Sequence, residues 1–411
     1  GGGGSGPGRG VRWGRVAALR DGPRSVPFAC GGRPVFLGAG LFAVIGIAAW
    51  VWIYVSGSTP LGELPPFLWH GHEMLYGFIC AAIAGFLLTA VPSWTGSRGF
   101  AGTPLVILTL LWLAGRVAFA TAAALPPLWL AVAELSFLPM LAFLIGRSLL
   151  RERNRNFPML IIVAVLWGID AWFLYAITTG DFTLASRALR VGIGVVALLI
   201  TVIGGRVVPN FTASALRRRG IAVEIRSRVL VERVTIASMA LAVAIDAVAP
   251  WHWSAAAVAG VAAIAHAVRL SGWRSLRTLA EPIVWVLHAA YVWLPIGLAL
   301  KAIHLGTGAA WAFQWQHALT VGAAATMILG VTTRAALGHT GRPLIVSRGI
   351  GIAYVLLLLA ALVRVFGPAL LPASYIATIE TAAILWIVAF TIYLVIYAPI
   401  LTLARVDQKP G

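Results

Sequence analysis

HEMLYGFICAAIAGFLLTAVPSWTG (residues 72–96) and HALTVGAAATMILGVTTRAALGHTG (residues 317–341) are two apolar stretches that share one frame. Each begins with a histidine, His72 or His317, carries glycine five and thirteen residues later, and ends with Thr-Gly. An apolar run of about 20 residues is long enough to cross the hydrocarbon core of a bilayer as a helix. The shared frame therefore predicts two equivalent transmembrane helices, each with an imidazole at the same end.

The composition of the whole chain is that of a membrane protein. Its 411 residues are 60% hydrophobic and 11% charged, whereas soluble domains carry about 25% charged residues. The sequence therefore predicts an all-α polytopic membrane protein with twelve transmembrane helices. The predicted spans are residues 35–55, 72–95, 104–124, 127–147, 158–178, 188–208, 230–249, 252–270, 283–304, 313–337, 344–366 and 375–403.

A third span repeats part of the same frame. The sixth span is followed by the sequence PNFT (209–212), and the second span ends with the related sequence PSWT (92–95). The second, sixth and tenth spans are thus related, which predicts three arcs of four helices rather than the six-helix repeat of many transporters. This arrangement is similar to the principal subunit of haem-copper oxidases, although the sixth and seventh spans contain no histidine for that subunit's second metal.

The formal net charge of +18 indicates orientation in a membrane rather than binding to nucleic acid. If the N-terminus is cytoplasmic, all but five of the 31 basic residues fall on the cytoplasmic side, as the positive-inside rule requires. We therefore expect cytoplasmic termini and basic segments that contact anionic lipid. The predicted organisation is a flexible basic segment 1–33, a single membrane domain 34–404 and a cytoplasmic tail 405–411. The five outer basic residues are Arg116, Arg187, Arg190, Lys301 and Arg364.

The outer ends of the spans gather histidines and arginines that suit a haem. A haem iron takes two neutral imidazoles from facing helices, and arginine pairs well with haem carboxylates. His72 and His317 lie at equal depth, which makes them the candidate axial ligands. Arg187 and Arg190 lie at the same level and are the candidate partners of the carboxylates. His70, about 200° from His72 around the helix, is the candidate ligand of a copper ion or a second haem.

A second polar group lies at the cytoplasmic side of the ninth and tenth spans. It contains His288, Arg334, His339 and Arg342, and it is a candidate for another metal site or for a proton or quinol path. The alternative for these residues is helix capping and loop contacts, and the alternative for each outer histidine is an interface residue bonded to a backbone carbonyl. The chain has no C-x-x-C-H motif, so any haem is expected to be bound without thioether links, as haem b is.

Longer motifs around these histidines resemble the NnrS family. They are WHGHEMLYGF (69–78), AGFLLTAVPSWTG (84–96), GGRVVPNFT (204–212), LHAAYVWLPIGL (287–298) and the stretch 317–342. The resemblance implies a haem- and copper-containing protein of the bacterial inner membrane that is linked to nitric oxide metabolism and denitrification. The histidines inside the shared motifs are His70, His72, His288, His317 and His339.

The function expected from these features is that of a haem-b redox protein that reduces or detoxifies nitric oxide, with electrons from quinol or a partner protein. Two alternatives stay open: a transporter or metal permease that uses the outer histidines transiently, and a sensor that binds the gas without turnover. The four-helix repeat favours the redox protein over the transporter.

The glycines of the shared frame lie roughly opposite His72, so we expect them to pack against neighbouring helices rather than contact the cofactor.

Overall fold

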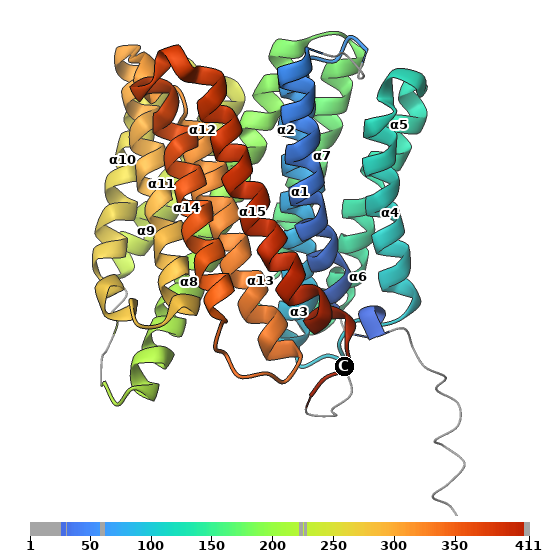
Figure 1. The fold of residues 1–411 in the computed structure, drawn as a ribbon, viewed down its shortest axis with the longest axis vertical. Coiled ribbons are helices and arrows are strands. Elements are labelled where there is room, and N and C mark those ends of the chain that lie inside the picture. The colour runs from blue at the N-terminus through green and yellow to red at the C-terminus, as the bar shows by residue number, and fades with distance from the viewer. Residues whose placement is uncertain (1–25, 30, 58–61, 222–224, 226–227, 407–411) are drawn as a thin grey trace, which may run out of the picture.

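The computed structural model describes residues 26–29, 31–57, 62–221, 225 and 228–406, so most of the predicted flexible segment 1–33 falls outside it. The described residues form helices and no strands, and the long helices run side by side along one axis (Figure 1). Eleven of these helices are α1 (Arg33–Ser56), α4 (Thr103–Ala120), α5 (Pro127–Leu135), α6 (Phe137–Arg151), α7 (Pro158–Thr178), α8 (Phe182–Arg218), α9 (Val229–Val248), α10 (Trp253–Ser271), α11 (Pro282–Thr307), α14 (Arg348–Leu370) and α15 (Tyr375–Thr402).

Among the described residues, eleven of the twelve predicted spans are long and apolar enough to cross a membrane, which confirms a polytopic membrane protein. The predicted seventh span is α9, which carries three charged residues, Glu232, Arg233 and Asp246. Each of the other eleven spans contains a membrane-crossing length with at most two charged residues. Asp246 pairs with Lys301 of α11, and Glu232 contacts Arg269 of α10, so neighbouring helices neutralise both carboxylates. A twelfth crossing stays a prediction.

The two helices of the shared frame have the same unusual interior. The second span consists of α2 (Pro66–His72), η3 (Glu73–Ile79) and α3 (Cys80–Thr95), and the tenth contains α12 (Trp315–His317), η7 (Ala318–Ala325) and α13 (Thr326–His339). Both η3 and η7 are π-helices, and each begins immediately after the histidine of the frame. π-Helical turns are rare and occur frequently at functional sites. The two spans are therefore built alike, and their irregular turns lie next to the histidines.

The glycines of the frame are contact points between helices. A Cβ atom on Gly77 would lie 2.4 Å from the Phe42 ring, and one on Gly322 would lie 2.3 Å from the Trp293 ring. Gly85 is equally close to an aromatic side chain of α1. Only glycine lets the neighbouring helices approach this closely, so the expected packing role of these glycines is confirmed.

Gly322→Ala is expected to destabilise the protein by about 1–3 kcal/mol, because the added methyl group must displace the Trp293 ring from a packed interface. Gly351→Ala is the matched control, because Gly351 of α14 has nothing within 4 Å of an added Cβ atom. The control is expected to be neutral or to stabilise its helix by up to about 1 kcal/mol. Thermal unfolding in detergent, followed by circular dichroism, compares the two; equal melting temperatures would contradict a packing role for Gly322.

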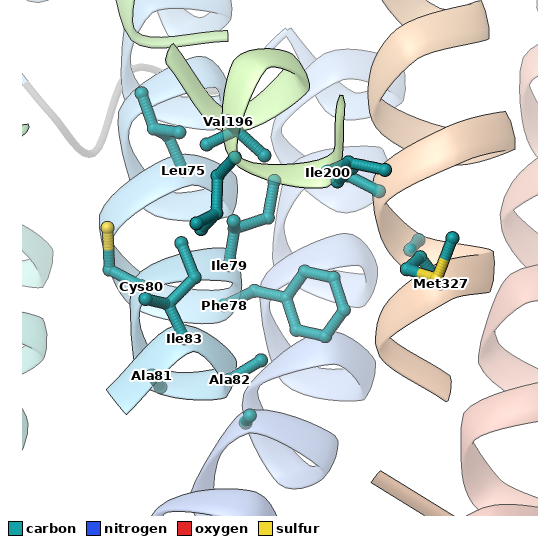
Figure 2. Close-up of a cluster of buried hydrophobic side chains, with 14 of the residues drawn as sticks. Leu75, Phe78, Ile79, Cys80, Ala81, Ala82, Ile83, Val196, Ile200 and Met327 are labelled. Carbon is teal, nitrogen blue, oxygen red and sulfur yellow. The ribbon is translucent and has the colours of Figure 1, made fainter. Parts of the chain in front are cut away.

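The second, sixth and tenth spans meet at an apolar cluster inside the bundle. Figure 2 shows Ile79 and Ile83 of the second span close to Val196 and Ile200 of α8, with Met327 of α13 across from them. These five side chains line an apolar cavity of about 90 Å³. The three spans that are related in sequence are therefore neighbours in space.

Both described ends of the chain lie at the same end of the bundle (Figure 1). Arg33 Nη1 donates to the carbonyl oxygen of Leu403 at 2.8 Å, and the backbone N–H of Val406 donates to the carbonyl oxygen of Thr340 at 3.2 Å. These contacts hold the two ends of the membrane bundle together on one side. Which side of the membrane this is stays a prediction.

Candidate metal centre

His70 and His317 line one cavity of about 80 Å³ inside the bundle. The two histidines come from the second and tenth spans, and the other walls come from α1, α14 and α15. Lining residues recur at helical spacing within each wall, as His70, Met74 and Phe78 do, so each helix presents one face to the cavity. Most of this surface is apolar, with Trp50 and Trp386 as further aromatic walls.

Two polar side chains of this cavity, His70 and Arg364, each have a buried hydrogen-bonding atom without a partner in the protein. The His70 ring stacks on Trp50 with their centroids 4.5 Å apart, and its Nδ1 atom is buried without a partner in the protein. Arg364 of α14 is the one Lys, Arg, Asp or Glu among the described lining residues, and its Nη1 atom is likewise buried without a partner. Buried polar atoms normally have partners, so two imidazoles and a guanidinium in one apolar cavity indicate a ligand site.

His72 points into a different part of the bundle. Its ring is fully buried and stacks on those of Phe119 and Phe173, at centroid distances of 3.9 and 4.8 Å. Its Nδ1 atom lies 3.1 Å from Glu73, and its Nε2 atom lies 3.0 Å from Asp170. The structure therefore brings His70 together with His317, whereas the sequence frame pairs His72 with His317.

The difference follows from rotation around the second span. His70 and His72 point about 200° apart, so only one of them can face the tenth span. The face of His70 continues with Met74 and Phe78, which are apolar and line the cavity. The face of His72 continues with the hydroxyl-bearing Tyr76, whose ring lies 4.9 Å from the imidazole. This apolar stripe after His70 is the sequence feature that distinguishes the two histidines.

Arg187 and Arg190 do not line the cavity of His70 and His317. Both lie on α8 beside a separate hollow, and the Arg190 guanidinium lies 4.4 Å from the centroid of the Trp251 ring. The cation that shares the cavity is Arg364, which the sequence places among the outer basic residues without a role. The sequence predicts how far along a transmembrane span a residue lies, but it does not predict which neighbouring helix the side chain of that residue faces.

The two histidines of the predicted cytoplasmic group, His288 and His339, make hydrogen bonds and loop contacts. Both ring nitrogens of His288 contact hydroxyl groups, at 2.7 Å from Thr212 and 2.9 Å from Ser275. The carbonyl oxygen of His339, at the end of α13, accepts a hydrogen bond from Arg405. Within the described part of the chain, neither histidine belongs to a group of three metal-binding side chains. This is the arrangement expected from the alternative of capping and loop contacts.

His72 belongs to a buried cluster of ionisable side chains from four spans. Arg116 of α4 contacts both Glu73 of η3 and Glu134 of α5, and Asp170 of α7 contacts His72. All five side chains are buried. Ionisable groups inside a membrane are costly and are therefore candidates for function. Sequence reasoning missed this cluster, because its members come from separate spans and share no spacing.

The family model described as NnrS protein matches residues 26–405, nearly the whole chain. The chain belongs to the NnrS family. A comparison with curated proteins gives no match. Membership of the NnrS family links the chain to nitric oxide metabolism and to bound metal or haem in a membrane. The resemblance that rested on the histidine motifs is thus confirmed.

The donor groups of the His70–His317 cavity suit the metal chemistry of the NnrS family. Imidazoles bind both haem iron and copper, and a guanidinium suits the carboxylates of a haem. The cavity of about 80 Å³ has room for an ion or a diatomic gas, whereas pockets for larger organic ligands measure about 300–1,000 Å³. The donor set fits a haem, and its macrocycle requires lining side chains such as Trp50 to move outward.

Proposed function

We propose that the protein is a haem-binding membrane protein that binds nitric oxide and reduces or detoxifies it. In this proposal His70 and His317 would hold the iron of a non-covalently bound haem b, and Arg364 would pair with a haem carboxylate. A haem supplies a redox-active iron that binds nitric oxide. One observation carries the proposal: histidines from the two matched spans share an apolar cavity with a guanidinium whose Nη1 atom is buried without a partner in the protein.

A copper ion is the second candidate for the same cavity, and the volume of about 80 Å³ favours it. Arg364 argues against it, because a fixed positive charge beside a bare cation is unfavourable in an apolar cavity. The same charge stabilises the anionic carboxylate of a haem. We therefore place haem first and expect the lining side chains to rearrange when it binds.

The chain's own residues surround the cavity with apolar walls that suit an apolar gas. Nitric oxide dissolves in lipid, and Trp50, Phe78 and Trp386 give the cavity apolar walls. Ile79 lines both this cavity and the central cavity of about 90 Å³, so apolar side chains separate the two. In this proposal quinol or a partner protein supplies electrons, and the protein lies in the bacterial inner membrane with both termini in the cytoplasm.

The purified protein is expected to show a Soret band that shifts on reduction and shifts again when nitric oxide is added. Anaerobic consumption of nitric oxide with reduced quinol then separates turnover from binding, since a sensor binds the gas without consuming it. If the purified protein is colourless and contains copper, the site would be assigned to copper instead of haem. A colourless protein that exchanges a solute across liposomes would contradict the proposal and support a transporter.

A further inference from the structure

The buried cluster around His72 has the geometry of a metal site. The Nε2 atom of His72 lies 3.0 Å from Asp170 Oδ1 and 3.8 Å from Glu134 Oε1. One donor atom from each of the three residues lies within 4.8 Å of the others. Zn²⁺ forms bonds of about 2.0–2.2 Å to such atoms, so donors in a tetrahedral site lie roughly 3.4 Å apart. Side-chain movements of about 1 Å would therefore let all three donors reach one ion.

We propose that His72, Glu134 and Asp170 bind a divalent first-row metal ion, at a site separate from the cavity of His70 and His317. The donors are one imidazole nitrogen and carboxylate oxygens, and the thiol of Cys80 is not among them. Imidazole and carboxylate donors suit Zn²⁺ and similar divalent ions, whereas Cu⁺ prefers thiolate and thioether sulfur. This proposal does not depend on the proposed haem function, because the ligands of the ion lie outside the cavity of His70 and His317.

The neighbours of His72 orient it as the neighbours of a metal ligand do. In metal sites the ring nitrogen that does not bind the ion usually donates to a carboxylate or carbonyl oxygen. Here Nδ1 of His72 lies 3.1 Å from Glu73, which leaves Nε2 to face Asp170 and Glu134. Phe119 stacks on the imidazole with an interplanar angle of 14°, so the ring has little freedom to turn away.

The charge of the cluster also favours a divalent cation. Glu73, Glu134 and Asp170 carry three formal negative charges, and Arg116 supplies one positive charge through contacts with two of them. With a neutral His72, two negative charges remain inside the bundle, where unpaired charge is strongly unfavourable. The Oε2 atom of Glu134 is buried without any partner in the protein. One divalent ion would neutralise the cluster.

The ion would join parts of the bundle that are distant in sequence. Its ligands come from α2, α5 and α7, and Arg116 connects α4 to two of the same carboxylates. Since α2 also carries His70, a fixed His72 holds the helix that presents His70 to the other cavity. The site is therefore expected to be structural and to position one side of the proposed haem site.

Zn²⁺ binding to the purified full-length protein in detergent tests the proposal. After chelation and desalting, the wild-type protein is expected to take up about one Zn²⁺ per chain, measured by mass spectrometry of the metal. Glu134→Gln and Asp170→Asn are each expected to lower Zn²⁺ affinity by about tenfold or more. Glu380→Gln is the matched control, because Glu380 of α15 lines a separate hollow beside Val51.

Two further measurements separate this site from the haem site and from failures of folding. The double variant His70→Ala with His317→Ala is expected to lose haem but keep Zn²⁺, whereas loss of Zn²⁺ would assign the ion to the other cavity. X-ray absorption of the Zn²⁺-loaded wild-type protein is expected to show one imidazole and carboxylate oxygens. Two imidazoles, a sulfur ligand, or no uptake of Zn²⁺ by the wild-type protein would overturn the proposal.

Discussion

His70→Ala and His317→Ala are each expected to lower the haem content of the purified protein by about tenfold or more, because each removes one of the imidazoles that share the cavity. His72→Gln is expected to retain most of the haem, because His72 stacks on Phe119 and Phe173 outside that cavity and affects only the position of the helix that carries His70. The pyridine haemochrome of each variant, normalised to protein, measures the effect. Size-exclusion chromatography shows whether each variant has folded.

His288→Gln is the matched control for this experiment, since His288 is a buried histidine whose two ring nitrogens already have hydroxyl partners. It is expected to retain haem. Arg364→Gln is expected to weaken haem retention without abolishing it, because it removes the carboxylate partner and keeps both imidazoles. If His72→Gln loses haem while His70→Ala retains it, the pairing from the sequence frame is correct and the cavity is not the haem site.

Arg116→Met is expected to destabilise the protein by about 3–5 kcal/mol, because it leaves Glu73 and Glu134 buried without their cationic partner. Methionine keeps an unbranched side chain as far as the position of the arginine Nε atom, so the lost contacts are mainly those of the charged guanidinium. This loss is a large part of a typical total stability of about 5–15 kcal/mol. Thermal unfolding in detergent measures it as a lower melting temperature.

A triple variant separates charge from packing in that experiment. Arg116→Met combined with Glu73→Gln and Glu134→Gln removes the carboxylates together with their partner, and it is expected to recover most of the lost stability. Arg190→Met is the control, because Arg190 is an arginine of a membrane span that stacks on Trp251 and interacts with a single carboxylate, Asp246, rather than contacting two. A triple variant no more stable than Arg116→Met would show that packing, not unpaired charge, causes the loss.

The transmembrane architecture could be predicted from the sequence, because the length and apolarity of each span leave few alternatives. The helix α7 (Pro158–Thr178) coincides with the predicted span 158–178. The frame that begins at His72 and His317 corresponds to two helices with π-helical turns at the same place. The largest boundary error is in the sixth span, predicted as 188–208, whereas α8 runs from Phe182 to Arg218. The second span begins at Pro66 rather than at residue 72, and proline is suited to the first turn of a helix.

The partners of each side chain could not be predicted in the same way. Hydropathy places a residue along the membrane normal, but it does not say which neighbouring helix a given face meets. In the structure His70, rather than His72, lines the cavity together with His317. In the same way the cation in that cavity is Arg364, rather than Arg187 or Arg190. The cluster of Arg116 with its carboxylates was missed for the same reason.

The π-helical turn after His72 makes the site sensitive to chain length. A π-helix closes its hydrogen bonds over five residues and an α-helix over four, so removing one residue from η3 lets the span become an uninterrupted α-helix. The segment before the deletion would then rotate by about 100° and move by about 1.5 Å relative to α3. His70 would turn away from His317, although the sequence of the histidine motifs would be unchanged except for the deleted residue. A homologue one residue shorter between His72 and Cys80 would thus keep the membrane fold and lose this cavity.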